Sequence, residues 1–432
     1  MLKVVARDSL ARNSVLIMGS TVGTAGLGYL YWLLAARGLP QPAIGTATAL
    51  ISVATVVSMV SNLGVGHMFI QRLPGADLAA WSRIVSAGLL FGCSSTAFAA
   101  FLAAAVLPAA GANFAFLAGA GGASALIVTA VALTASTLLD YVFIAHRASQ
   151  GMLGRNLGVA VGKVLTLSVL VWAGVGGAAA VLLAWTVPSV AVTAYTLGVS
   201  LTRLRPGAKL AGAGIGAELP HVRGSLTGHH LINLAQAGPS ALLPVLVTAR
   251  LGAEANGHFY VAWMTASVLF MVSPAVASAM YAERANKSAA GLRRAALVVL
   301  AVIGAPALAL FTCGDLILGL FSAGYAAEGE LLLRILVLAA IPDAVTNLAV
   351  AHWRSLGRYR RCLRLNLLMA VTCLSLTWLW LPGTGIEGAG IAWLAGQSVG
   401  AVAVAVHAVS PLWRRVEDPA PVQPVRADHR RA

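Results

Sequence analysis

The sequence has little charge and few cysteines. Only 10% of its 432 residues are Asp, Glu, Lys or Arg, whereas a soluble domain carries roughly 25%. With 59% hydrophobic residues and a mean hydropathy of +0.84, this shortage of charge excludes a soluble globular chain. The four cysteines form no CxxC pair and no metal-ligand spacing, so we expect buried free thiols and no disulfide framework.

Long apolar runs take the place of charge. Many runs of about 20 residues carry no charge, which is enough to cross a hydrocarbon core of about 30 Å as a helix. They are too long and too continuously apolar for the strands of a membrane barrel. We therefore predict an all-α polytopic membrane protein with about twelve transmembrane helices. The predicted spans are 14–36, 43–70, 84–107, 114–139, 157–175, 177–201, 225–249, 258–281, 295–313, 331–351, 363–381 and 389–410.

The formal net charge of +15 comes mostly from arginines in the short gaps between these runs. Alternate gaps hold nearly all of the Lys and Arg, while the opposite gaps hold only Arg37 and Arg250. The positive-inside rule explains this alternation and predicts both termini on the cytoplasmic side. The charge therefore reports membrane topology and does not indicate a nucleic-acid partner. The first apolar run is too long for a signal peptide, so we expect it to be a retained span.

The longest interruption, Thr202 to Gly224, divides the chain into two similar halves. Pro206 and Pro220, with five glycines, prevent a continuous helix through it. Ala36-Arg37 and Gly45 recur as Ala249-Arg250 and Gly257 in the second half. Six spans per half predict a parallel repeat about an axis along the membrane normal. The expected parts are an amino-terminal lobe (1–201), a cytoplasmic basic linker (202–224), a carboxy-terminal lobe (225–410) and a disordered cytoplasmic tail (411–432).

Lys163 is the candidate cation within a span. Three preceding glycines suggest a phosphate loop, but Leu157 and Val164 stand where that loop needs Gly and Ser or Thr. The glycines instead give a smooth face for helix packing. Two roles remain open for Lys163: its ammonium extends to the interface, or it faces an aqueous cavity and binds an anion. Arg37 at the external end of the first span either complements the helix dipole or contributes to binding.

Polar stripes mark two of the spans. His229, Asn233 and Gln236 recur at helical spacing in the span 225–249, and Ser52, Thr55 and Asn62 lie in the span 43–70. Because polar atoms are costly against lipid, these faces meet either a neighbouring helix or water. Interhelical hydrogen bonding and a shared wet cavity are both compatible with the stripes. We favour the cavity.

Asp343 and Asn347 lie near the middle of the span 331–351. An acid at this depth is paired with a base such as Lys163, is neutral, or forms part of a coupling-ion site. Asp140 lies at the cytoplasmic end of its span, where it serves topology or pairs with Arg147. No residue constellation predicts catalysis, a cofactor or a metal.

The opening of the chain resembles a known family. Asn13-Ser14, Ala35-Ala36-Arg37, Leu39, Gly45, the run Ser61–Gly66 and Arg72-Leu73-Pro74 are similar to the first two helices of bacterial polysaccharide-export flippases of the Wzx type. That superfamily also holds multidrug-extrusion (MATE) transporters and the lipid II flippase. The resemblance covers about residues 13–74, and beyond them it rests on span count and the two-half layout. It implies two six-helix lobes around a V-shaped central cavity.

The resemblance also implies a function and its partners. A flippase of this family moves a polyprenyl-pyrophosphate-linked oligosaccharide across the bacterial cytoplasmic membrane without covalent chemistry, so we expect no enzyme and no cofactor. The implied partners are the lipid-linked glycan, membrane lipids and polysaccharide polymerase or assembly proteins. One departure is that the expected cavity has few cations, chiefly Lys163. The rivals are an ion-coupled drug antiporter of the same fold, an enzyme acting on the same lipids, and a non-transporting scaffold.

Overall fold

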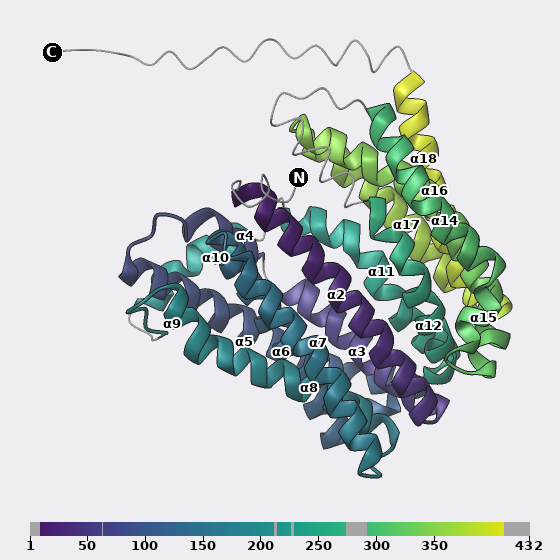
Figure 1. Ribbon diagram of the computed structural model, residues 1–432, viewed down its shortest axis with the longest axis horizontal. Coiled ribbons are helices and arrows are strands. Elements are labelled where there is room, and N and C mark those ends of the chain that lie inside the picture. The colour runs from purple at the N-terminus through teal and green to yellow at the C-terminus, as the bar shows by residue number, and fades with distance from the viewer. Residues whose placement is uncertain (1–8, 63, 211–213, 226–228, 274–291, 410–432) are drawn as a thin grey trace.

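The computed structural model describes residues 9–62, 64–210, 214–225, 229–273 and 292–409, which form helices and connecting turns without strands (Figure 1). The first half contains α2 (Ser9–Gly38), α3 (Gln41–Ser61), α4 (Val65–Arg72), α5 (Leu78–Ala110), the 3₁₀ turn η1 (Ala112–Leu117), α6 (Ala120–Ala145), α7 (Ser149–Trp172), α8 (Gly177–Tyr195), the π-helical turn η2 (Thr196–Ser200) and α9 (Leu201–Leu204). The 3₁₀ turn η3 (Ile215–Glu218) and α10 (Leu219–Ser225) follow. The second half contains α11 (His229–Leu251), α12 (Ala253–Phe270), α14 (Leu292–Thr312), α15 (Gly314–Gly319), α16 (Ala323–Ser355), α17 (Tyr359–Thr384) and α18 (Glu387–Val409).

Each of the twelve predicted spans overlaps a different long helix of the described residues. Eight of these helices are long and apolar enough to cross a membrane by length and composition: α3, α5, α6, α7, α8 with its continuation to Leu204, α16, α17 and α18. The helices α2, α11, α12 and α14 complete the set. The predicted fold class is therefore confirmed. The predicted disordered tail (411–432) and the end of the predicted span 258–281, from residue 274 onward, lie outside the described residues.

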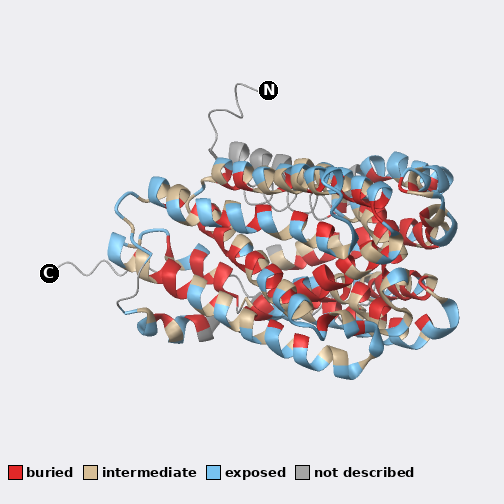
Figure 2. Cartoon of the chain, turned by 90° about the horizontal axis from the view of Figure 1, so that it is seen from below, coloured by how far each residue is buried: buried red, intermediate tan, exposed pale blue. Residues whose placement is uncertain are grey.

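The outer surface of the bundle is apolar. Buried residues follow the inner faces of the helices, while large hydrophobic side chains such as Leu165, Val371 and Leu379 are exposed on the outside (Figure 2). Trp172, at the end of α7, is 89% exposed, as expected for an aromatic ring at the membrane–water interface. An apolar exterior around a helical bundle is what contact with lipid requires.

Two predicted spans differ from the observed helices. The span 43–70 is broken, because α3 ends at Ser61 and α4 begins at Val65. The Asn62 side chain accepts a hydrogen bond from the Gly64 backbone N–H at 3.0 Å, and Gly64 has φ +67°, which glycine adopts without strain. In the span 114–139, a 3₁₀ turn occupies the predicted start, and α6 instead runs from Ala120 to Ala145.

The helices pack into two lobes. Within the first lobe α2 packs on α7, α5 on α6, and α7 on α8; within the second α16 and α17 pack on α18, and α11 packs on α17. The main contacts between the lobes are made by α3, which packs against both α11 and α12. Figure 1 shows the amino-terminal lobe in purple to teal beside the carboxy-terminal lobe in green to yellow.

The crossing of α3 and α12 is unusually close because two glycines meet there. A Cβ atom added to Gly257 would lie 3.2 Å from the Gly45 Cα, and one added to Gly45 would lie 2.1 Å from the Ala253 carbonyl oxygen. Gly45 and Gly257 are the equivalent positions of the repeat found in the sequence. A residue that contacts its own repeat equivalent lies at the axis relating the halves, so the contact agrees with a parallel duplication.

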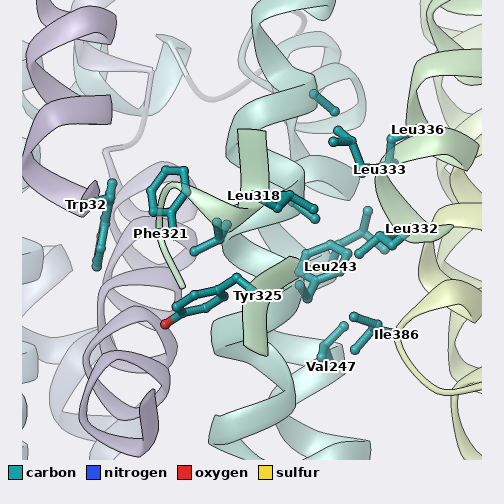
Figure 3. Packing of buried hydrophobic residues seen from close by; sticks show 14 of the residues in the cluster. Trp32, Leu243, Val247, Leu318, Phe321, Tyr325, Leu332, Leu333, Leu336 and Ile386 are labelled. Atoms are coloured by element: carbon teal, nitrogen blue, oxygen red, sulfur yellow. The ribbon is translucent and has the colours of Figure 1, made fainter. Parts of the chain in front are cut away.

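A hydrophobic cluster joins the lobes at the end where α2 turns into α3 and α11 turns into α12. Trp32 lies beside Phe321, and Tyr325, Leu243 and Val247 continue the packing across the interface (Figure 3). These five side chains are almost fully buried. Both described ends of the chain, at α2 and α18, lie toward the opposite end of the bundle (Figure 1). The lobes are thus sealed at the end away from the termini.

The described part of the linker packs on the first lobe. As predicted, no continuous helix crosses it; η3 and α10 are short and contact α5 and α4. The Glu218 carboxylate is buried and forms ion pairs with Arg72 and Arg83. Burial raises the pKa of this carboxyl, but hydrogen bonds from Arg83 and Arg72 outweigh it, so the pKa lies below the ordinary 4.5.

Candidate functional site

A cavity of about 540 Å³ lies between the lobes, toward the end of the bundle where the termini emerge. Its walls come from the middle of α2, the last turns of α6, the first turns of α7 and the residue after α12. The residues that line it are Thr24, Ala25, Thr137, Asp140, Tyr141, Ile144, Met152, Asn156 and Met271. Because Met271 belongs to the second lobe, a movement of one lobe against the other changes the shape of this cavity.

An ion pair forms part of the cavity wall. Asp140 pairs with Arg155, which lies on the facing helix α7, and not with Arg147, the partner named in one of its two predicted roles. Arg147 instead occupies the turn between α6 and α7, with φ +53°. The Arg155 guanidinium also donates to Ser136 Oγ at 2.7 Å and to Asn156 Oδ1 at 2.8 Å. A buried arginine that reaches three partners is held in one orientation, and it holds the Asp140 carboxylate in turn.

A second cavity, of about 150 Å³, lies where α3 breaks. It is lined by Met59, Asn62, Gly64, Gly66, His67, Tyr141, His230, Leu234 and Ala237. The predicted site residue Asn62 therefore faces a space between the lobes, although its side chain also caps the break. Tyr141 lines both cavities, and its ring packs so closely on Gly66 that an added Cβ would lie 2.3 Å from it.

The predicted stripe on α11 is only partly visible. His229 and Asn233 lie in α11, and their side chains are outside the described part of the structure. Gln236 is exposed and accepts a hydrogen bond from Arg354 Nη2 at 2.8 Å, which joins α11 to α16. Arg354 is a residue that the charge pattern assigns to topology.

The stripe on α3 is directed largely to its own helix. The Ser52 hydroxyl, which is buried, donates to the Thr48 carbonyl at 2.7 Å, and the Thr55 hydroxyl donates to the Ile51 carbonyl at 2.8 Å. Thr55 is exposed, while neither residue lines the two cavities described above. Further along the same face, Ser58 accepts from Thr134 of α6 at 2.8 Å, so this part of the stripe is interhelical hydrogen bonding.

Lys163 has a role that the sequence did not indicate. Its ammonium lies 3.1 Å from the centre of the Trp185 ring on α8, a cation–π contact within the first lobe. The side chain is partly buried and lines neither cavity. A tryptophan partner gives a lysine a favourable position inside a membrane helix without a counter-ion.

Asp343 and Asn347 form a buried polar cluster in the second lobe. The Asp343 carboxylate, 6% exposed, accepts from Ser273 Oγ and from Asn347 Nδ2, each at 2.9 Å. Nearby, Thr346 donates to Gln397 Oε1 at 3.1 Å. The structure therefore brings together Asp343 and Asn347 but not Asp343 and Lys163. Asp343 contacts Ser273 and Asn347 in the second lobe, whereas Lys163 contacts Trp185 in the first.

Arg37 and Arg250 lie near the sealed end. Arg37 is exposed, and its Nε donates to the Leu320 carbonyl at 2.8 Å, which links α2 to the turn after α15 in the other lobe. Arg250 stacks over the Trp378 ring with its guanidinium carbon 4.2 Å from the ring centre. Arg37 thus joins the two lobes and is distant in the fold from the cavity-lining residues.

Sequence reasoning missed the central pair of the cavity. Arg155 was assigned to the positive-inside pattern, and Asp140 to topology or to Arg147. The separation of 15 residues across a turn is the one signal that points to their contact, because it places them on facing turns of two consecutive helices. Within the described residues, no group of three or more His, Cys, Asp or Glu side chains is placed to hold a metal ion.

Comparisons with known proteins place this architecture. No family model and no curated protein sequence matches the chain. Among solved structures, the lipid II flippase MurJ in an inward closed conformation is 12% identical, with a TM-score of 0.73 over 92% of this chain and 88% of that one. An inward-facing multidrug resistance MATE family transporter of the MOP superfamily is 16% identical, with a TM-score of 0.61 over 91% and 93%. A MATE crystal structure in complex with MaD5 is 13% identical, with a TM-score of 0.61 over 94% and 95%. The chain therefore has the fold shared by MATE transporters and the MurJ flippase.

Proposed function

We propose that the protein is a flippase that moves polyprenyl-pyrophosphate-linked oligosaccharide precursors of a cell-surface polysaccharide across the bacterial cytoplasmic membrane. The observation that carries the proposal is a cavity between two lobes that are sealed together at the opposite end, with polar side chains such as Asp140 and Asn156 in its wall. A space of this kind admits a polar head group from one side of the membrane only. The structural similarity to MurJ, a lipid II flippase, supports a lipid-linked cargo.

The proposed mechanism is alternating access without covalent chemistry. The lobes touch through the close crossing of α3 and α12, where Gly45 and Gly257 meet. A contact between backbones leaves few side chains to be rearranged when one lobe rocks on the other. Because this crossing lies in the first turns of α3 and α12, at the sealed end, opening of that end would part Gly45 from Gly257 together with Trp32 from Phe321, while the lobes close around the cavity at the other end. The polar head group moves with the cavity while the polyprenyl tail stays in lipid.

The cellular setting belongs to the same proposal. The arginine-rich gaps and the positive-inside rule support a cytoplasmic location of both termini, and in that orientation the cavity opens to the cytoplasm. The partners we propose are membrane lipids and polysaccharide polymerase or assembly proteins that receive the translocated glycan.

A second candidate function is an ion-coupled antiporter of small molecules. The observation that favours it is the buried Asp343 carboxylate with the Ser273 hydroxyl and Asn347 amide around it. A carboxylate in this position suits binding of a proton or a small cation. Such coupling is also compatible with a flippase, so the cargo decides between the two candidates.

The test is transport in proteoliposomes with a reversible crosslink across the cavity. Cysteines replace Ala25 of the first lobe and Met271 of the second, in a chain whose exposed Cys313 is changed to serine. A cleavable bismaleimide should stop the movement of a fluorescent polyprenyl-pyrophosphate glycan, and reduction should restore it. The matched control carries cysteines at Ile144 and Met152, which line the same cavity within one lobe.

The outcomes separate the candidates. Loss of glycan transport in the cross-lobe variant alone supports a flippase that works by lobe movement. Failure of the uncrosslinked protein to move the glycan, together with expulsion of a cationic dye down a Na⁺ or H⁺ gradient, supports the antiporter. In that case Asp343→Asn should abolish the dependence of expulsion on the gradient.

A further inference from the structure

Among the described residues that line the larger cavity, Asp140 is the one that carries a formal charge. Its side chain is 26% exposed, whereas the Arg155 side chain that pairs with it is 2% exposed. The carboxylate therefore faces the cavity, and the guanidinium lies behind it in the wall. A ligand in the cavity meets an acceptor group whose charge is already offset by a buried arginine.

The remaining hydrogen-bonding capacity of this wall is specific. One Asp140 oxygen accepts from Arg155, and the other is 3.4 Å from Asn156 Nδ2, which leaves acceptor positions on both oxygens open toward the cavity. The Asn156 amide group retains a donor. The Thr137 hydroxyl donates to the Leu133 carbonyl at 2.9 Å, so its lone pairs can accept. The wall thus offers several acceptors and a donor side by side, on two consecutive helices.

Three classes of ligand differ in how they fit this wall. A phosphate or pyrophosphate presents only hydrogen-bond acceptors, and the Asp140 oxygens that it would meet are acceptors as well, so no hydrogen bond forms between them. An organic cation seeks an unpaired negative charge, but Arg155 already neutralises this one. A neutral sugar presents hydroxyl donors to the carboxylate and acceptors to the Asn156 amide, and its apolar ring face suits Tyr141 in the same wall.

We propose that Asp140, Asn156 and Thr137 form a sugar-binding subsite, in which the carboxylate accepts hydrogen bonds from the hydroxyl groups of a neutral sugar. Arg155 is a positioning residue that fixes the carboxylate. The subsite deepens the proposed function, on which its biological meaning rests, because it assigns this cavity to the glycan and places the pyrophosphate elsewhere. Selection against acidic sugars follows from the same carboxylate.

The test measures binding of free disaccharides to the full-length protein in lipid nanodiscs by isothermal calorimetry. The probes are the neutral disaccharides chitobiose, lactose and mannobiose, with cellobiuronic acid as an acidic member. We expect at least one neutral disaccharide to bind and the acidic one to bind more weakly. Asp140→Asn should weaken binding of the neutral disaccharide about tenfold, which is the effect of losing one hydrogen bond to a charged group. The difference in affinity between the neutral and the acidic disaccharide should become smaller.

Control variants separate binding from folding. Asp140→Asn leaves Arg155 unpaired in the wall, so the double variant Asp140→Asn/Arg155→Gln removes both charges and should show the same loss of affinity with restored stability. Arg155→Lys keeps the charge and should keep the preference for neutral sugars, whereas Arg155→Gln should weaken binding of the neutral disaccharide, because the Asp140 carboxylate is no longer held in position. Glu330→Gln, which removes a carboxylate paired with Arg334 on α16, should bind as wild type does.

The subsite and the flippase can fail separately. If none of the disaccharides binds, or if Asp140→Asn binds all of them as wild type does, the subsite is wrong, whatever the transport assay shows. If disaccharides bind with the expected dependence on Asp140 but the lipid-linked glycan does not cross proteoliposomes, the subsite stands and the flippase proposal fails. If the lipid-linked glycan and sugar-free undecaprenyl pyrophosphate cross equally well, with equal losses in Asp140→Asn, the carboxylate does not recognise the sugar.

Discussion

Replacing Gly45 with alanine tests the closest contact between the lobes. A Cβ at this position would lie 2.1 Å from the Ala253 carbonyl oxygen and 2.6 Å from its carbon, both backbone atoms. Since a carbon–oxygen contact normally begins near 3.3 Å, the two helices must separate by about 1.2 Å. Overpacking of this kind costs up to about 3 kcal/mol, and alanine returns about 1 kcal/mol of helix propensity. We expect a net loss of about 2 kcal/mol.

The matched control is Gly304→Ala in α14, where an added Cβ meets no atom within 4 Å. It should gain about 1 kcal/mol from helix propensity alone, so the two variants differ by about 3 kcal/mol. Unfolding can be followed in detergent with a thiol-reactive dye, because Cys362 and Cys373 are buried and react only when the chain opens. Equal stability of Gly45→Ala and Gly304→Ala would refute the close crossing.

Three further predictions follow from single contacts. Glu218→Gln removes the ion pairs that hold the linker and should speed tryptic cleavage of the linker about tenfold at pH 7. In the wild type the pKa of Glu218 lies below 4.5, so the protection against cleavage is complete above about pH 4.5 and is lost as the pH falls through the lowered pKa. A rate of cleavage by pepsin that stays constant from pH 5 to 2 would contradict this prediction. Lys163→Gln should lose about 1 kcal/mol of stability with its Trp185 contact while Lys163→Arg keeps it, as measured by thermal unfolding, and equal melting of the two variants would exclude the cation–π contact. Arg37→Ala removes the bond to the Leu320 carbonyl at the sealed end, so crosslinking across the opposite cavity should become roughly threefold faster, and an unchanged rate would show that the bond does not bias the lobes.

The sequence by itself determined the number and approximate place of the helices. A run of about 20 apolar residues is a local property, and in lipid a chain of this composition has little choice but to form a helix. The equivalence of Gly45 and Gly257 could also be recognised from the sequence, since a duplication leaves the same residues at a fixed offset along the chain. The break at Asn62 was missed because the apolar residues continue through it, and only the cap from Asn62 to Gly64 shows that the helix ends.

Only the tertiary structure decided which side chains meet. Asp140 pairs with Arg155 instead of Arg147, Lys163 contacts Trp185, and Asp343 accepts a hydrogen bond from Ser273. The sequence analysis predicted none of these three contacts. The physical reason is that lipid tails are as apolar as the protein interior, so hydrophobic periodicity does not tell which face of a membrane helix turns inward. The rotation of each helix about its own axis is set by packing against its neighbours. That rotation placed an acid on the cavity wall and its base behind it.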